Sequence, residues 1–385
     1  MKCGSFIIFS SDDWGWKTSK YQVSIRLARD NTVLFISSVG FRPPTASRGD
    51  LGRIFRKVKD FLRGVRQVEP NLYVLTPLII PFWRGGYVER LNVGLLAVQI
   101  AWARVRLKIA DPYLLVFSQN WHDLVVRQKR RKLVYYCVDD HSGFSGLNAQ
   151  SFQKKDEALT QVADLVLCSS RLLYERKREV CGRVEYLPHG VDYHHFSRAV
   201  LDPALQPPPE TAPLKRPVVG FFGHISYDWV DVDLLKRLAK SRPSWTVLLI
   251  GRYSIAEDEF ASFPNVVYVG EKDFAELPAY CKAMDVGLIP FLKSRLTDHC
   301  NPLKLYEYLA AGLPVVSTDI PEVSYFKDRV RIAGDAELFI DACDAAVAEG
   351  EVPRKARSVA MAGFSWDRRV ETICMLLREG NRVSA

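Results

Sequence analysis

Short, almost wholly apolar runs alternate with helical patterns along this chain, and the alternation stops once and then begins again. In the first series the apolar runs lie at residues 5–10, 32–38, 72–76, 113–117, 133–138 and 165–168. Strands that alternate with helices predict a parallel sheet with right-handed crossovers, buried on both faces. The first half of the chain is therefore predicted to be a doubly wound α/β domain.

A second series of the same kind begins at residue 218. Its apolar runs are VVGFFG, TVLLIG, VVYVG, VGLIPF and PVVST, at residues 218–223, 246–251, 266–270, 286–291 and 314–318. The Pro-rich residues 199–217 separate the two series and are predicted to be a linker. We therefore expect an N-terminal Rossmann-like domain over residues 1–198 and a second one over residues 218–365.

The formal net charge is +9, and much of the excess lies in residues 53–66 and 127–132. In the first segment, RIFRKVKDFLRGVR, apolar side chains recur at helical spacing between the basic ones. A basic amphipathic helix fits an anionic membrane surface, although the stripe also fits a surface helix packed on its own core. No helix-turn-helix, zinc-finger or aromatic RNA-binding signature accompanies the charge, so we expect no nucleic-acid partner.

The same features give an expected location. The longest apolar run, around residues 91–103, is shorter than the roughly 18–20 residues of a membrane-spanning helix. The N-terminal apolar run is typical of a first strand rather than of a signal peptide. The eight cysteines are scattered, with no CxxC pair and no metal-ligand spacing, as in reducing compartments. We expect a cytoplasmic protein at the inner face of the plasma membrane.

Residues 299–318, HCNPLKLYEYLAAGLPVVST, combine three features that suit a nucleotide sugar. A polar loop runs into a short predicted helix, whose N-terminus offers N–H groups and a positive dipole to phosphate. Lys304 adds a cation in the first turn, and Glu307, one turn later, could accept both hydroxyls of a ribose. The alternative is an ordinary helix–strand connection in which Lys304 and Glu307 form a solvated pair.

Five segments, in order, resemble a known family. They are LPHGVDYHHF at 187–196, FFGHIS at 221–226, VGEKDFAELPAYCKAMDVGLIPF at 269–291, NPLKLYEYLAAGLPVVST at 301–318 and FSWDRRVETICMLL at 364–377. The chain resembles GT-B glycosyltransferases, close to the GT4-like and teichuronic-acid-type enzymes and to the inverting glucuronosyltransferase of xanthan assembly. The resemblance implies two Rossmann-like domains facing a central cleft, with a C-terminal helix, 366–385, that crosses back to the N-terminal domain.

The resemblance also implies a donor site for a nucleotide sugar, with a UDP-sugar as the expected donor and no metal requirement. Its expected residues are Gly223, His224, Lys272, Asn301, Leu303, Lys304 and Glu307. Gly223 would permit close approach of the diphosphate, Lys304 would neutralise it in place of a metal ion, and Glu307 would hold the ribose. Residues 270–272 would lie along the nucleobase through backbone groups. His224 could bind phosphate or be structural.

One position departs from the retaining members of the family, which carry two glutamates with seven residues between them. Glu307 matches the second glutamate, but His299 stands at the first position, next to Asp298. The xanthan-type enzyme also lacks the pair and inverts, so we expect inversion.

Inversion requires a general base for the acceptor hydroxyl. Asp139 and Asp140 directly follow the predicted strand at 133–138, and Asp140 aligns with the catalytic aspartate of the xanthan-type enzyme. Asp140 is therefore the expected base, with Asp139 and then His141 as alternatives. Either aspartate could instead cap a turn or the next helix.

The loop SSDDWGWKTSK after the first strand lies on the acceptor side in the family. Asp13, Trp14 and Lys17 offer stacking surface and charge for a sugar, although the tryptophans could instead pack under the sheet edge. The expected function is transfer of a sugar to a lipid-linked or saccharide acceptor in exopolysaccharide or cell-envelope biosynthesis. The alternatives are a retaining GT4-type transferase and a non-catalytic scaffold that binds a nucleotide sugar.

Overall fold

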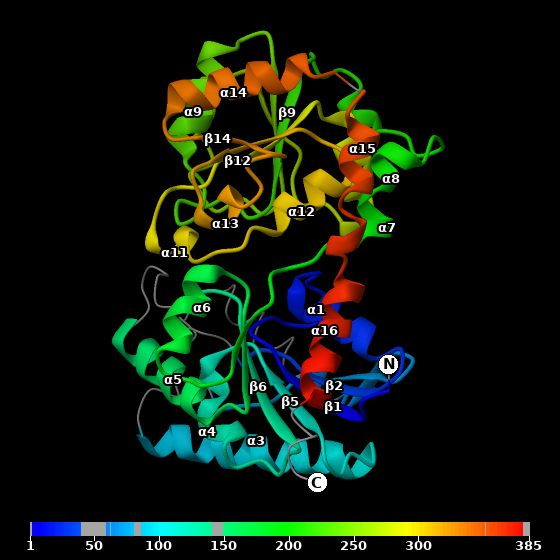
Figure 1. Ribbon diagram of the computed structural model, residues 1–385, viewed down its shortest axis with the longest axis vertical. Helices are drawn as coiled ribbons and strands as arrows, with labels where there is room; N and C mark the ends of the chain where they lie inside the picture. Colours follow the sequence, from blue (N-terminus) through cyan, green and yellow to red (C-terminus); the bar gives the residue numbers. More distant parts are fainter. Residues whose placement is uncertain are drawn as a thin grey trace. The chain divides into compact units, whose positions relative to one another are not determined.

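The computed structural model describes residues 2–39, 59–61, 63–80, 86–140, 149–350 and 352–379. These residues form two compact units, each built on one sheet (Figure 1). The described residues up to Leu187, together with those from Arg369 onward, make up the first unit. Pro188–Arg368 makes up the second. The α/β prediction is confirmed in both.

The sheet of the first unit has the strand order β3-β4-β2-β1-β5-β6-β7-β8. The strands are β1 (Ser5–Phe9), β2 (Thr32–Ile36), β3 (Arg66–Glu69), β4 (Leu72–Leu75), β5 (Tyr113–Val116), β6 (Lys132–Cys137), β7 (Leu165–Cys168) and β8 (Val184–Tyr186). All are parallel except β3, which pairs antiparallel with β4 at the edge. The six predicted strands are confirmed, whereas the edge strands β3 and β8 were not predicted, because they are short and only half-buried.

The helices of the first unit follow the predicted alternation. They are α1 (Ser19–Leu27), α3 (Gly86–Arg106), η1 (Gln119–Trp121), α4 (His122–Val125), α5 (Ala149–Val162) and α6 (Arg171–Arg178). The sequence pattern predicts a helix over residues 120–130, but the observed helix is shorter, since α4 ends at Val125.

The sequence predicts a basic helix over residues 53–66, but the observed helix ends before Arg66. Residues 59–61 are helical, Gly64 has a φ of 66°, and Arg66 already belongs to β3. A positive φ is not helical, so the helix cannot reach Arg66. Residues 53–58 and Leu62 lie outside the described residues.

The sheet of the second unit has the order β11-β10-β9-β12-β13-β14, and every pair is parallel. Its strands are β9 (Val218–Phe222), β10 (Thr246–Ile250), β11 (Val266–Tyr268), β12 (Val286–Ile289), β13 (Val315–Thr318) and β14 (Arg331–Ala333). The helices are α7 (Tyr193–Phe196), α8 (Arg198–Leu201), η3 (Pro209–Thr211), α9 (Val232–Ser241), η4 (Phe274–Glu276), α10 (Leu277–Ala283), α11 (Arg295–Asp298), α12 (Leu303–Ala310), α13 (Pro321–Ser324), α14 (Ala336–Ala348), α15 (Arg354–Val359), η5 (Ala362–Phe364) and α16 (Trp366–Glu379).

The boundary between the units is not at 199–217, where the Pro-rich composition placed a linker. The chain enters the second unit at Pro188, and residues 188–217 pack on that unit. Phe196 stacks on Phe222 with 6.2 Å between ring centroids, and Glu210 Oε1 lies 2.7 Å from Lys272 Nζ. Prolines limit hydrogen bonding but not packing, so this stretch follows the surface of the second unit without being a free tether.

The C-terminal helix α16 begins in the second unit and continues in the first. Residues 366–368 belong to the second unit, and the helix from Arg369 onward belongs to the first. Its last turn accepts hydrogen bonds from the first unit. Lys132 Nζ donates to the carbonyl of Leu377 at 3.1 Å, and Arg183 Nη2 to that of Leu376 at 2.7 Å. The helix ends at Glu379 in the described residues, and the predicted 380–385 lie outside them.

Among its parallel strands, each sheet reverses its strand order once. In the first unit the reversal lies between β1 and β5, and in the second between β9 and β12. Ligands of open α/β sheets bind beyond the carboxyl ends of the strands at this point. The loops after β1 and β9 are therefore the places to look for a site. Within the described ranges, no helix is both long and apolar enough to cross a membrane.

Candidate active site

Two glycines at the carboxyl ends of β9 and β10 stand where a side chain would have almost no room. Gly223 has a φ of 148° and Gly251 a φ of 124°, both in the region that favours glycine. A Cβ on Gly251 would lie 2.1 Å from the carbonyl oxygen of Gly223, and a Cβ on Gly223 only 2.7 Å from Lys304 Cε. The missing side chains thus allow Lys304 to lie against the backbone that follows β9.

We expect Gly251→Ala to lower the free energy of unfolding by about 2–4 kcal/mol, because the methyl group meets a backbone oxygen that cannot move aside. Gly270→Ala is the matched control, since Gly270 also has a positive φ, 81°, but nothing lies within 4 Å of its Cβ position. Urea denaturation compares the two variants. Equal losses in both would show that backbone strain alone matters, and not the close approach to Gly223.

The helix α12 is fixed beneath this point by its inner face. Phe222 N donates to the Tyr308 hydroxyl at 2.9 Å, and Gly287 leaves room for the Tyr308 ring. The helix begins at Leu303, which is half-buried, and its N-cap residue Pro302 makes no side-chain capping hydrogen bond. Its first N–H groups and the positive end of its dipole are thus available to an anion.

Asn301 holds the entry to α12 and is buried, with 1% of its surface exposed. Its side-chain Nδ2 donates to Glu322 Oε2 at 3.2 Å, and its carbonyl lies 3.0 Å from Nδ1 of His189. His189 comes from the LPHGV segment, so this segment supports the loop before α12. The contacts give Asn301 a structural role, and its predicted donor contact stays a prediction.

Lys304 lies in a cluster of positive charge. Burial lowers the pKa of His224 first, and the charges of Arg252 and Lys304 lower it further. His224 Nε2 is 2.9 Å from Ser254 Oγ. In the described part of the chain, Lys304 Nζ has no ion-pair partner. Three basic side chains around a glycine turn and a helix N-terminus suit a diphosphate.

Glu307 follows Lys304 by one turn of α12 and is half-buried. Burial raises the pKa of Glu307 to about 7, and the charge of Lys304 opposes this only in part. No hydrogen bond holds the carboxylate within the described ranges. A half-buried carboxylate without a hydrogen-bond partner is stabilised by hydroxyl donors such as those of a ribose.

Lys272 is engaged within the protein. Its ammonium pairs with Glu210, to which the Tyr280 hydroxyl also donates, and it lies over the Tyr280 ring at 5.5 Å. The contact with Lys272 lowers the pKa of Glu210 to about 2. The side chain of Lys272 thus ties the 199–217 segment to α10, and its predicted contact with a nucleobase stays a prediction.

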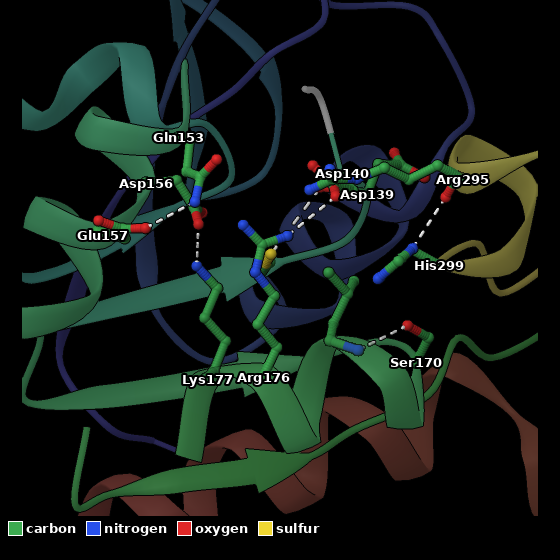
Figure 2. A network of polar contacts seen from close by, with 12 residues as sticks. Asp139, Asp140, Gln153, Asp156, Glu157, Ser170, Arg176, Lys177, Arg295 and His299 are labelled. Atoms are coloured by element: carbon green, nitrogen blue, oxygen red, sulfur yellow. Dashed lines mark hydrogen bonds and ion pairs between the residues drawn. The ribbon is translucent and has the colours of Figure 1, made fainter. Parts of the chain in front are cut away.

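In the first unit, Asp140 follows β6 after Val138 and Asp139, and it is 7% exposed. Arg176 Nη1 of α6 donates to Asp140 Oδ2 at 3.0 Å, and Figure 2 shows the guanidinium reaching Asp140 while the next residue, Lys177, points to Asp156. The ion pair favours the ionised carboxylate, the form from which a base acts. His141, the third candidate, lies outside the described residues.

A buried network of hydrogen bonds lies beside the Asp140–Arg176 pair. Lys177 is 2% exposed, donates to Thr160 Oγ1 at 2.8 Å and pairs with Asp156. The Tyr135 hydroxyl donates to Asp156 Oδ1 at 2.6 Å. Because each member has a partner, the network links α6 to α5 and β6 and helps to position the guanidinium that contacts Asp140.

In the loop after β1, some side chains pack within the protein and others are exposed. Trp14 packs on Tyr21 and Phe35, with centroids 4.9 and 5.1 Å away, so the packing alternative describes its ring best. Lys17 lies over the Tyr21 ring at 3.7 Å, and both Asp13 and Lys17 are exposed. Asp12 accepts from Thr18 Oγ1 at 2.7 Å and fixes the loop.

His299, at the position of the first family glutamate, ends α11. Its Nδ1 lies 2.8 Å from the carbonyl oxygen of Arg295 (Figure 2), so Nδ1 carries the proton and Nε2 is the acceptor in the neutral ring. A neutral imidazole offers no carboxylate charge to a donor sugar.

Comparisons with known proteins agree with this geometry. Residues 216–349, which contain every predicted donor residue, match the family described as Glycosyl transferases group 1. The second unit carries a group 1 glycosyltransferase domain. Its Gly223, Lys304 and Glu307 all lie within the matched segment of the group 1 domain.

One curated relative is 32% identical over 237 residues, covering 55% of this chain and 58% of its own length. It is TuaH of Bacillus subtilis (strain 168), named as a teichuronic acid biosynthesis glycosyltransferase. The chain thus spans little more than half the length of that relative.

Solved structures that resemble this chain have the GT-B fold. Sucrose-phosphate synthase from Thermosynechococcus elongatus has a TM-score of 0.70 at 15% identity, covering 99% of this chain and 100% of its own. HepE from Anabaena, in complex with UDP, has a TM-score of 0.66 at 15% identity, covering 98% and 100%. At these identities the likeness shows the fold alone, and the GT-B prediction is confirmed.

Three residues of the site were not singled out from the sequence. Arg176 belongs to a run of basic residues on α6 that is typical of a solvated face, so no signal marks it. Gly251 and Arg252 follow a buried strand as Gly223 and His224 do, and this repeated Gly-basic pair could have been found. Among the described residues, no group of three or more His, Cys, Asp or Glu could hold a metal ion.

Proposed function

We propose that this protein is a glycosyltransferase that moves a sugar from a UDP-sugar to a lipid-linked or saccharide acceptor in exopolysaccharide or cell-envelope biosynthesis. One observation carries the proposal: Gly223, Lys304 and Glu307 meet at the strand-order reversal of a group 1 domain. The named role of TuaH and the UDP bound by HepE support the acceptor class and the nucleotide.

In the proposed mechanism the leaving diphosphate is stabilised by Lys304, by the N–H groups of α12 and by His224 and Arg252, without a metal ion. Glu307 accepts the ribose hydroxyls. Asp140, held by Arg176, takes the proton of the attacking acceptor hydroxyl. Since His299 replaces the first glutamate of retaining relatives, the reaction is proposed to invert the anomeric centre.

The test is incubation of the protein with UDP-sugars and membrane lipid extract, with EDTA present, followed by product isolation. A product whose anomeric configuration is opposite to that of the donor supports the proposal. A product of the same configuration would instead favour a retaining transferase. UDP-sugar binding without any product from a range of acceptors would favour the non-catalytic scaffold.

Glu307 gives donor binding a pH dependence. Ribose hydroxyls donate to the ionised carboxylate, so the donor-free protein must release a proton below its pKa of about 7 before binding. We expect affinity for UDP-glucose to be about tenfold lower at pH 6 than at pH 8, and nearly flat in Glu307→Gln. UDP-glucose does not itself titrate in this range.

Calorimetric titration of both proteins gives the two slopes. His224 is present in both, so the difference between the slopes isolates Glu307. The same slope in the variant would contradict the assignment of Glu307 to the ribose.

The raised pKa of Glu307 also has a consequence for the free protein. Its carboxyl keeps a proton in the folded state that the unfolded chain releases, so the free energy of unfolding falls as pH rises from 4.5 to about 7. Glu307→Gln is therefore expected to stabilise the ligand-free protein at pH 8, by about 1–3 kcal/mol, and hardly at pH 4.5. Urea denaturation at the two pH values measures this.

A further inference from the structure

The outer face of α3 is apolar. Six large side chains on it are exposed, at spacings of three or four residues: Tyr87, Leu91, Leu95, Val98, Trp102 and Val105. The exposed fractions reach 68% for Val98, 76% for Tyr87 and 81% for Val105. At about 1.5 Å of rise per residue, the stripe covers nearly the whole length of a 21-residue helix.

The inner face of α3 explains why the outer residues are not needed for the core. Gln99 exchanges hydrogen bonds with the backbone of Leu78, at 2.8 and 2.9 Å, and Asn92 does the same with Ile80. Leu96 and Ile100 are buried between them. The inner face thus combines apolar packing with paired polar side chains, and the large apolar side chains of the outer face remain exposed, which is unusual for a surface helix in water.

Cations lie beside this stripe. Arg90 and Arg106 are exposed near its two ends, and the Arg106 guanidinium lies 5.6 Å from the Trp102 ring. Over α3, all of which is described, no Asp or Glu is on the exposed face, since Glu89 is half-buried and pairs with Lys155. Figure 1 shows α3 at the outer edge of the first unit.

The stripe also adjoins the basic segment around residue 60. A Cβ on Gly64 would lie 3.5 Å from the Trp102 ring, and Lys59 and Arg63 precede Gly64. The exposed apolar face thus adjoins two basic side chains, of which Arg63 pairs with Asp60 at 2.9 Å.

We infer that the outer face of α3 docks on an anionic lipid surface. Apolar side chains would enter the acyl boundary, while Arg90 and Arg106 would contact anionic headgroups, as amphipathic interfacial helices do. A second copy of the chain fits less well, because a pair of α3 helices brings only arginines together and offers them no carboxylate. This inference deepens the proposed function by naming the surface that would bring the enzyme to a lipid-linked acceptor.

Vesicle flotation of the full chain tests the docking, with phosphatidylcholine vesicles compared with vesicles that also contain phosphatidylglycerol. The wild-type protein should float with the anionic vesicles and much less with the neutral ones. In Val98→Asp/Val105→Asp, partitioning should fall by about 100-fold, since each lost apolar side chain is worth roughly tenfold. Val352→Asp is the matched control, at a valine that is 95% exposed in the second unit.

Arg90→Gln/Arg106→Gln adds a separate arm. It should weaken binding to anionic vesicles by about tenfold or more and leave the weak binding to neutral ones unchanged. Anionic vesicles that bind the double aspartate variant as well as the wild type would overturn the inference. A wild-type dimer in light scattering that the aspartates split into monomers would overturn it in favour of a second copy.

Nucleotide binding is measured on the same samples. Val98→Asp/Val105→Asp should keep the melting-temperature shift given by UDP, because α3 lies in the first unit and the donor residues in the second. Loss of flotation in this variant, with UDP binding kept, is the result that both proposals predict. Flotation without any nucleotide binding would overturn the donor site alone, so the two proposals can fail separately.

Discussion

Asp140→Asn should lower the rate of sugar transfer by about 10²–10⁴-fold and leave the affinity for the UDP-sugar almost unchanged. Asparagine keeps the shape of the side chain but cannot take a proton from the acceptor hydroxyl. The donor residues lie in the other unit, so their contacts stay intact. Steady-state transfer, together with calorimetric titration of UDP-glucose, measures both quantities.

Two further variants sharpen this result. Asp139→Asn changes the neighbouring carboxylate and should reduce transfer by less than Asp140→Asn. Arg176→Gln removes the guanidinium that lies 3.0 Å from Asp140, so the pH profile of transfer should shift, which a purely structural loss would not cause. If Asp139→Asn abolished transfer and Asp140→Asn did not, the base would be misassigned.

Lys304→Ala should weaken donor binding by about 30–1,000-fold, equivalent to roughly 2–4 kcal/mol for a charged group on a diphosphate. The ammonium lies over the Gly223 turn, has no ion-pair partner within the described ranges and stands at the N-terminus of α12. Its loss also removes the charge that stabilises the departing UDP, so turnover should fall along with affinity.

Lys293→Ala is the control for Lys304→Ala. Lys293 lies in the same unit, is 65% exposed and pairs with Asp319, so its removal should leave donor affinity within about twofold. A Lys304→Ala variant with the donor affinity of the wild type would contradict the phosphate role. In that case the alternative of a solvated pair with Glu307 would gain support.

Patterns that repeat locally made the fold predictable. The strands predicted between residues 5–10 and 314–318 are short apolar runs. Each can be recognised from its own residues, without the rest of the chain. The edge strands β3 and β8 do not, because half-exposed strands lack such a run. Composition also misled at residues 199–217, where prolines are typical of a linker, while Phe196 and Glu210 pack the adjoining chain on the second unit.

The site could be predicted where a residue stands in a motif and not where only the tertiary structure brings it in. Lys304 and Glu307 are one turn apart in a single helix, so their neighbourhood follows from the sequence. Arg176 reaches Asp140 across 36 positions of the chain, and only the packing of α6 on β7 and β8 brings them together. The raised pKa of Glu307 likewise depends on burial, which spacing alone does not give.

Contacts within the protein that the sequence did not predict have the same origin. Residues 270–272 were expected along a nucleobase through backbone groups, and the side chain of Lys272 pairs with Glu210, 62 positions away. Trp14 was expected to stack on a sugar, yet its ring packs on Tyr21 and Phe35. In both cases a side chain suited to a ligand is also suited to its own protein, and long-range contacts decide between the two.

The central claim is that the second unit holds a nucleotide-sugar site built on Gly223, Lys304 and Glu307. Its most direct test is the melting temperature of the purified protein with UDP, GDP, dTDP or CMP, with EDTA throughout. A ligand that binds only the folded state stabilises it by RT ln(1 + [L]/Kd), so millimolar UDP on a micromolar site gives about 4 kcal/mol. We predict a shift with UDP that is lost in Lys304→Ala. No shift with any of the four nucleotides would contradict the claim.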